Sequence, residues 1–173
     1  MSLDLQKFMA MWNPWPERME DTVYGIFGDK FADFNDALIS AEALVAGGSV
    51  LAPYIDGRIS DIDIYIHASK AEEFVEVLKK ELGYYFVSNG NYIAPAYDQS
   101  FFRKNNILAR FRLFSGLYTY IDIMIIPDDI TLLSVVTNFD LTFCEIWYDG
   151  KTVSAVDPAG ILAKTGMLKK VLL

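Results

Sequence analysis

The sequence predicts an α+β fold in which flanking helices pack against a mixed, mostly antiparallel β-sheet. Three observations lead to this prediction. Short apolar or alternating segments recur between turn residues, other segments have the periodicity of amphipathic helices, and an Asp-Gly pair at residues 149–150 separates two strand-like segments. With 173 residues and no internal repeat, the chain suits one domain with a single core.

The first part of the chain is expected to alternate helices and strands. Residues 1–25, which are rich in Met and Trp, are interpreted as an N-terminal arm that packs on the core. Residues 30–40 carry apolar side chains at helical spacing. Residues 43–46 predict a short apolar strand, and residues 61–66 alternate with period two, as a half-buried strand does.

The next helix has the clearest local signals. Ser69 and Glu72 have the spacing of a capping box, and Gly83 supplies a stop signal. The apolar stripe between them consists of Ala71, Phe74, Val75 and Leu78. We therefore expect a helix that starts at the capping box, packs one face on the sheet and ends at Gly83.

The following region is expected to be mainly β-structure. Its strand-like segments, separated by turn residues, are residues 84–88, 91–96, 107–114 and 117–126. A short helix is predicted at residues 131–136.

Residues 138–173 are expected to form a C-terminal hairpin and helix. Strands at residues 141–148 and 151–156 flank the Asp-Gly pair, which suits a two-residue turn because both positions tolerate positive φ. Asp157, followed by proline, has the pattern of a helix N-cap and first helical residue, and Gly166 is expected to end that helix.

Composition excludes several classes of function. The only cysteine, Cys144, and the only histidine, His67, exclude an intramolecular disulfide and a Cys/His zinc cluster. No apolar run is long enough to span a membrane, and the first residues do not resemble a secretory signal, so we expect a cytoplasmic protein. The net charge of −8 argues against broad adhesion to nucleic acid or anionic membrane. A small anionic substrate that is accompanied by a divalent metal is compatible with this net charge.

Gly47, Gly48 and Ser49 follow an apolar strand directly. Glycines let the backbone approach a ligand closely, successive N–H groups can form an anion-binding concavity, and the serine hydroxyl can bind a phosphate oxygen. The alternative is an ordinary flexible turn, which is the more common role of such a triplet.

Asp61 and Asp63 strengthen the functional interpretation. Residues two apart on a strand point to the same face, so the two carboxylates lie side by side while Ile62 and Ile64 point into the core. Neighbouring carboxylates repel one another unless a positive charge lies between them, and their hard oxygen ligands favour Mg²⁺ or Mn²⁺. The alternative is a solvated strand face at a sheet edge.

Asp122 lies within the apolar run 120–126, which is expected to be a strand buried on both faces. A buried aspartate is costly unless it is paired or binds metal. One interpretation is therefore a metal ligand, and the other is an aspartate that reaches a backbone N–H or Arg112. Arg110 and Arg112 share a strand face, so either one could reach a bound triphosphate if their strand lies beside that of Asp122.

The order and spacing of these residues resemble the signature of the nucleotidyltransferase superfamily, which includes DNA polymerase β, poly(A) polymerases and minimal nucleotidyltransferases. In that signature, Gly-Gly or Gly-Ser is followed, after a spacer, by Asp-h-Asp-h, where h is apolar. Here eleven residues separate Ser49 from Asp61, and Asp122 occupies the position of the third carboxylate on a later strand. The resemblance covers residues 43–126, the expected catalytic core.

The resemblance implies a nucleotidyltransferase-like sheet and a role for each site residue. The Gly-Gly-Ser segment would hold the phosphates of an NTP. Arg112 is a further candidate nucleotide contact because of its strand position and not because of the resemblance. The three aspartates would bind two Mg²⁺ or Mn²⁺ ions. The implied reaction is in-line attack of an acceptor hydroxyl on the α-phosphorus, which transfers NMP and releases pyrophosphate.

The acceptor is left open: it is a small molecule, a protein side chain or an RNA end. The sequence has no obvious helical domain for gripping a polymer, which argues against a large nucleic-acid substrate. Residues 138–150 resemble a segment of nucleotidyltransferase-like proteins from large DNA viruses and phages. Two alternatives are a catalytically silent nucleotide-binding module and an antitoxin-like nucleotidyltransferase acting on a toxin partner. The intact glycines and aspartates argue against the silent module.

Overall fold

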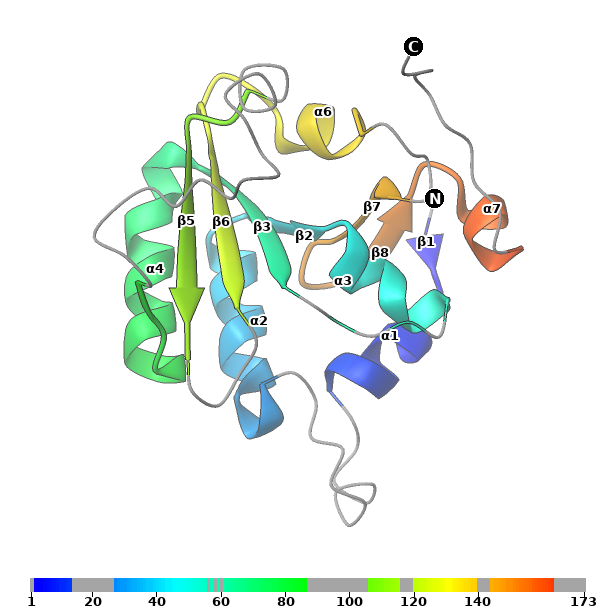
Figure 1. Cartoon of the computed structure of the whole chain (residues 1–173), viewed down its shortest axis with the longest axis horizontal. Coiled ribbons are helices and arrows are strands. Elements are labelled where there is room, and N and C mark those ends of the chain that lie inside the picture. The colour runs from blue at the N-terminus through cyan, green and yellow to red at the C-terminus, as the bar shows by residue number, and fades with distance from the viewer. Residues whose placement is uncertain are drawn as a thin grey trace.

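The sequence folds into a single mixed sheet that carries helices on both faces (Figure 1). The computed structural model describes residues 2–13, 27–55, 57, 59, 61–86, 106–115, 120–139 and 144–163. The elements in these ranges are β1 (Ser2–Leu3), α1 (Leu5–Trp12), η2 (Gly28–Lys30), α2 (Phe31–Ser40), β2 (Leu44–Ala46), α3 (Gly48–Leu51), η3 (Ala52–Tyr54), β3 (Ile62–His67), α4 (Ala68–Leu82), β4 (Tyr85–Phe86), β5 (Ala109–Phe114), β6 (Ile121–Ile126), α6 (Leu132–Val136), β7 (Ile146–Tyr148), β8 (Val153–Ala155) and α7 (Pro158–Leu162).

Among the described residues, the strands are ordered β1-β8-β7-β2-β3-β6-β5-β4. Strands β3 and β6 pair in parallel, and the other neighbouring pairs are antiparallel. The α+β class with a mixed, mostly antiparallel sheet is therefore confirmed.

The two faces of the sheet pack against different helices. On one face, alternate strand residues such as Ile62, Ile64 and Ile123 join a core with α2 and α4, which lie side by side behind the sheet in Figure 1. On the other face, Tyr65 and Met124 pack with α6 in a second, smaller cluster. The aspartates at 63 and 122 belong to this second face because each is two residues from Tyr65 or Met124 on its strand.

Helix α4 begins in a different way from the one predicted. Its N-cap is His67, and the backbone N–H of Ser69 donates to Oδ1 of Asp128 at 3.1 Å. The predicted Ser69 capping box is therefore wrong, because a carboxylate from the loop after β6 caps the helix instead of a local side chain. The predicted stop is confirmed: Gly83 adopts the left-handed conformation at the C-cap.

The hairpin between β7 and β8 has a shifted turn. Tyr148 pairs with Val153, so the strands do not close directly around the Asp-Gly pair as predicted. The Asp149 carboxylate accepts hydrogen bonds from the backbone N–H groups of Lys151 and Thr152, both at 2.8 Å, and this Asx-type turn displaces the register. Gly150 has φ of 98°, and a Cβ there would lie 2.4 Å from Cγ1 of Ile39.

Several other predicted elements are confirmed within the described residues. They are α2, β2, β3, β5, the described part of the 117–126 strand as β6, and the two capped helices α6 and α7. Thr131 caps α6, and Asp157 caps α7 by accepting from the N–H of Gly160 at 3.0 Å. The predicted strand 91–96, the start of the 117–126 strand and residues 14–25 of the arm lie outside the described residues. The predicted stop at Gly166 is wrong, because α7 already ends at Leu162 with Ala163 as its C-cap.

The N-terminal helix α1 lies against the rest of the domain. Phe8 and Trp12 are fully buried, and their rings stack with centroids 4.9 Å apart. The indole N–H of Trp12 donates to the carbonyl oxygen of Ser49 at 3.3 Å, and the Tyr54 hydroxyl donates to the carbonyl of Asp4 at 2.8 Å. Both bonds tie α1 to the segment that follows the Gly-Gly pair. Within the described ranges, no helix has the length and apolarity needed to cross a membrane.

Candidate active site

Three neighbouring strands, β3, β6 and β5, bring the predicted polar residues to one place on the α6 face of the sheet. Asp63 on β3 lies directly opposite Asp122 on β6, and Asp122 lies directly opposite Arg112 on β5. The intervening residues are apolar, isoleucines on β3 and β6 and Phe111 and Leu113 on β5, and this apolar anchoring on the opposite face holds the polar side chains in register.

Asp122 is held by two arginines. Its Oδ2 accepts from Nη2 of Arg110 at 2.7 Å and from Nη2 of Arg112 at 3.0 Å, while its Oδ1 accepts from Nε of Arg112 at 2.8 Å. Asp122 is 1% exposed and Arg110 is 3% exposed, so this pair is buried. Of the two interpretations of Asp122 that the sequence allows, the structure contains the pairing with Arg112.

Arg112 also reaches a second carboxylate. Its Nη2 donates to Oδ2 of Asp61, so one guanidinium nitrogen contacts both Asp61 and Asp122. The guanidinium carbon lies 4.7 Å from the centroid of the Tyr120 ring, a cation–π arrangement. Asp61 is more accessible than its partners, with a side chain that is 41% exposed.

The electrostatics of the site follow from this crowding. Burial is the first cause that raises the pKa of Asp63 to about 7, and the negative charge of Asp122 is the second. The positive charges of Arg110 and Arg112 act in the opposite direction. The hydrogen bond to Asp122 raises the pKa of the Arg112 guanidinium above its usual range, so this group stays charged.

The Gly-Gly-Ser segment begins at the level of Asp63, because Ala46 on β2 is the register partner of Asp63. Gly47 is the N-cap of α3, with φ of 85°, and its N–H donates to the carbonyl of Ile146 at 3.1 Å. Gly48 is exposed, whereas Ser49 is buried and its Oγ makes no hydrogen bond to any described residue. The two glycines thus face open space beside the aspartates.

The three predicted metal ligands differ in their surroundings. Among the described residues, no group of three or more Asp, Glu, His or Cys side chains is positioned to hold a metal ion. Both oxygens of Asp122 accept hydrogen bonds from arginines. Asp61 and Asp63 remain beside one another, with only one oxygen of Asp61 engaged by Arg112.

The sequence indicated Arg110 as a triphosphate contact but did not identify it as a partner of Asp122. The available signal was the period-two spacing of Arg110 and Arg112 on a strand whose other residues are apolar. Trp12 is a second such residue, because no sequence pattern links an N-terminal tryptophan to the carbonyl of Ser49.

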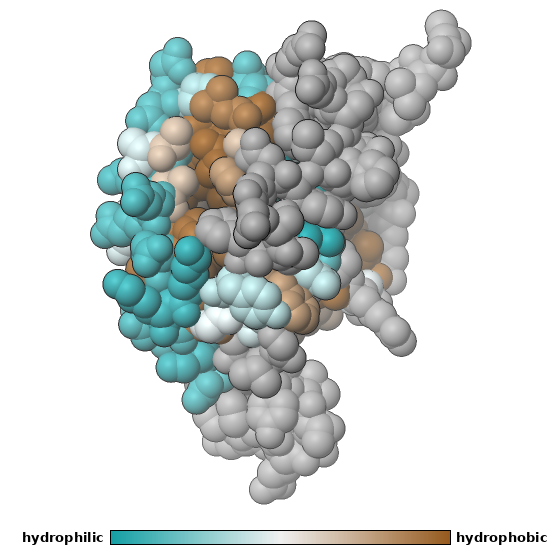
Figure 2. All heavy atoms as spheres, turned by 60° about the vertical axis from the view of Figure 1, so that its left-hand side comes forward, coloured by the Kyte–Doolittle hydropathy of each residue, from teal (hydrophilic) through white to brown (hydrophobic). Residues whose placement is uncertain are grey.

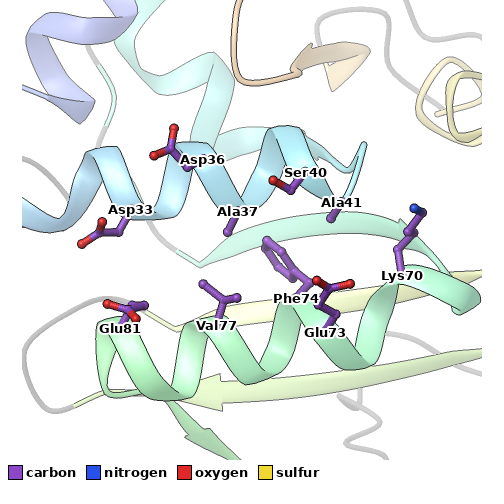
Figure 3. Close-up of a pocket in the computed structure, with 10 residues that line it drawn as sticks. All are labelled: Asp33, Asp36, Ala37, Ser40, Ala41, Lys70, Glu73, Phe74, Val77 and Glu81. Carbon is purple, nitrogen blue, oxygen red and sulfur yellow. The ribbon is translucent and has the colours of Figure 1, made fainter.

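Two hollows lie away from these aspartates. A groove of about 280 Å³ runs between α2 and α4 and is lined by acidic side chains from both helices (Figure 3). Lys70 lies at one end of this groove, and Asp33 and Glu81 lie at the other. Its carboxylates do not form a group that could hold a metal among the described residues.

The second hollow, of about 410 Å³, lies between α4 and the β5 side of the sheet. Its apolar lining includes Val75, Phe111 and Ile125. Figure 2 shows hydrophobic surface beside hydrophilic residues on this side of the molecule. Neither hollow contains a site residue predicted from the sequence.

Several solved structures share this fold. A CCA-adding enzyme in apo form II aligns with a TM-score of 0.58 and 15% identity over 97% of this chain and 38% of that chain. A complex of CCA-adding enzyme with ATP has a TM-score of 0.54 and 17% identity, covering 82% of this chain and 34% of that chain. The Thermotoga maritima enzyme complexed with tRNA_CCA has a TM-score of 0.54 and 16% identity, covering 82% and 33%.

No protein-family model matches the sequence, and no curated protein matches it. The chain spans about a third of the length of the CCA-adding enzymes whose fold it shares. At these identities the likeness concerns the fold: this chain has a nucleotidyltransferase-like fold.

Proposed function

We propose that this protein is a metal-dependent nucleotidyltransferase, which moves an NMP from an NTP to an acceptor hydroxyl and releases pyrophosphate. The observation that carries the proposal is the in-register placement of Asp63 and Asp122 on adjacent parallel strands, beside Asp61 and the open Gly-Gly segment. The nucleotidyltransferase-like fold supports it.

Asp61 and Asp63 are the residues that would hold a divalent cation. Their oxygens are hard ligands that suit Mg²⁺ or Mn²⁺. Burial first, and the negative charge of Asp122 second, raise the pKa of Asp63, and a bound cation would favour its ionised form. A bound cation would neutralise phosphate charge and polarise the phosphoryl oxygens. The chain's own contribution is to fix the two carboxylates on one strand end with apolar residues on the other face.

The Gly-Gly segment and Arg112 are the proposed phosphate contacts. Gly48 is exposed and is the first residue of α3, so its backbone N–H has no acceptor within the helix. Arg112 carries a guanidinium that stays charged and lies next to Asp61. Together they would orient the triphosphate, with catalysis resting on positioning and charge neutralisation.

The acceptor is proposed as a small molecule, a protein hydroxyl or an RNA end. The net charge of −8 favours the first two, because no counterion release would assist binding of a polyanion. An RNA end stays among the candidates, since one structure with this fold is a CCA-adding enzyme complexed with tRNA_CCA.

A second candidate is a nucleotide-binding module without turnover. The observation in its favour is that Arg110 and Arg112 engage both oxygens of Asp122. Such a module would bind an NTP with a divalent cation and leave it intact.

The test is incubation of the protein with each α-labelled NTP, Mg²⁺ or Mn²⁺ and a panel of small-molecule, protein and RNA acceptors. We expect label transfer that is abolished in Asp61→Ala/Asp63→Ala. The matched control is Asp36→Ala/Glu73→Ala, which removes the same charge from the groove between α2 and α4 and should transfer normally. Transfer that survives in the Asp61/Asp63 variant would refute the assignment, and NTP binding without transfer would favour the silent module.

A further inference from the structure

Arg112 occupies the space between two of the three predicted metal ligands. Its Nη2 contacts Oδ2 of Asp61 and Oδ2 of Asp122, and its Nε contacts Oδ1 of Asp122. A guanidinium that bridges two carboxylates does electrostatically what a shared divalent cation would do in the same place. The Arg112 side chain is 17% exposed, Asp61 is 41% exposed and Asp122 is 1% exposed, so solvent screens the contact with Asp122 less than the contact with Asp61.

Three further features hold Arg112 against Asp122. The Tyr120 ring covers the Arg112 guanidinium at 4.7 Å. Arg110, which is buried, binds Oδ2 of Asp122 at 2.7 Å from the neighbouring position on the same strand face. The register of β5 on β6 places Arg112 directly opposite Asp122, so the pairing is imposed by the sheet and not by a chance side-chain conformation.

The charge balance leads to the same conclusion. Asp61, Asp63 and Asp122 contribute three carboxylates, and Arg110 and Arg112 contribute two guanidinium groups. The group therefore carries one negative charge when all its members are ionised. One divalent cation suffices to reverse that charge, and a second would have to approach two fixed positive groups.

We propose that Arg112 takes the place of the second divalent cation, so that the site binds a single ion through Asp61 and Asp63 while Asp122 serves as the anchor of the two arginines. The inference rests on the proposed function for the location of the ion. It differs from the sequence-based expectation of two ions per site, with Asp122 as a shared ligand.

The experiment counts bound Mn²⁺ by electron paramagnetic resonance in the full chain, with and without the non-hydrolysable analogue α,β-methylene-ATP. We expect one bound Mn²⁺ per wild-type chain with and without the analogue. In Asp61→Ala/Asp63→Ala we expect no Mn²⁺ bound with an affinity comparable to that of the wild-type chain. Arg112→Gln removes the guanidinium that contacts both Asp61 and Asp122, leaves Arg110 on Oδ2 of Asp122, and should bind two ions with the analogue present. Arg112→Lys keeps the positive charge and should bind one.

The outcomes separate this inference from the proposed function. Two ions in the wild-type chain, no ion at all, or a single ion in folded Arg112→Gln would overturn the inference. If Arg112→Gln does not fold, the wild-type and Arg112→Lys counts decide it: one ion in each supports the proposal, and two in either overturns it. A single ion that depends on Asp61 and Asp63, observed without label transfer to any acceptor, would support this inference. The same result would contradict the proposed transfer reaction.

Discussion

Asp63 and Asp122 lie directly opposite one another on the parallel strands β3 and β6, and both side chains point to the α6 face of the sheet. Two carboxylates at this spacing are unfavourable unless positive charge accompanies them. Arg110 and Arg112 provide it to Asp122, whereas burial first and the charge of Asp122 second raise the pKa of Asp63. This asymmetry leads to the following predictions.

Removing Asp122 is expected to destabilise the protein far more than removing Asp61. Asp122→Ala takes a buried carboxylate away from two guanidinium groups, which should cost about 3 to 5 kcal/mol of unfolding free energy. Asp61 is 41% exposed, so Asp61→Ala should change the free energy by no more than about 1 kcal/mol. Urea denaturation followed by circular dichroism measures both, and equal losses would contradict the description of Asp122 as the buried anchor.

The two adjacent glycines are expected to respond differently to alanine. Gly47 has φ of 85°, which an alanine adopts only with strain, so Gly47→Ala should cost about 1 to 2 kcal/mol of stability. At Gly48 an added Cβ meets no atom of a described residue within 4 Å, so Gly48→Ala should change stability by less than about 0.5 kcal/mol.

The same Gly48→Ala variant tests the proposed phosphate contact. Its methyl group would project into the space where the backbone is meant to approach the triphosphate, so affinity for an NTP with Mg²⁺ should fall about tenfold, equivalent to about 1.4 kcal/mol. Isothermal titration calorimetry measures this affinity. Unchanged binding by the folded variant would place the nucleotide elsewhere.

Without divalent metal, Asp63 is expected to make stability depend on pH. Its pKa is raised to about 7 in the folded protein and returns to an ordinary value near 4 on unfolding. The stabilising contribution is therefore complete below about pH 4 and is lost as the pH rises through 7. Stability in EDTA should decline by about 1 to 3 kcal/mol between pH 4.5 and 7.5 relative to Asp63→Asn. Denaturation midpoints of the two proteins that run parallel across this range would contradict the prediction.

Trp12 is expected to support the Gly-Gly-Ser segment from the N-terminal helix. Trp12→Phe keeps a buried ring but loses the hydrogen bond to the Ser49 carbonyl, which should cost about 1 to 3 kcal/mol and weaken NTP binding severalfold. Phe8→Leu, on the same helix and stacked on Trp12, is the control: it should lower stability without weakening the affinity of the folded protein. Equal affinities in the two variants would show that the indole hydrogen bond has no effect on the site.

Local patterns were sufficient to predict the elements that position the site. The alternation of isoleucine and aspartate in residues 61–66 predicts β3, and the apolar run around Asp122 predicts β6, because each pattern follows from which face is buried. The stop at Gly83 was predictable from another local signal, because glycine readily adopts the left-handed conformation that ends a helix.

Features that depend on distant residues could not be predicted in this way. The carboxylate of Asp128 caps α4 from a loop that is remote in sequence. The shifted register at Asp149 is different, because it arises from hydrogen bonds within the turn itself. The partner of Asp122 was likewise undetermined. Only the strand order β3-β6-β5 brings Arg112 opposite Asp122 and in contact with Asp61, and strand order is a property of the whole sheet.

The most direct test of the central claim is a crystal structure of the protein with Mn²⁺ and a non-hydrolysable NTP. Anomalous scattering would locate the ion, and the difference density would locate the triphosphate. We predict an ion bound by Asp61 and Asp63, with phosphate oxygens beside the backbone of Gly48. A nucleotide bound in the groove between α2 and α4, or an ion that contacts neither Asp61 nor Asp63, would contradict the account.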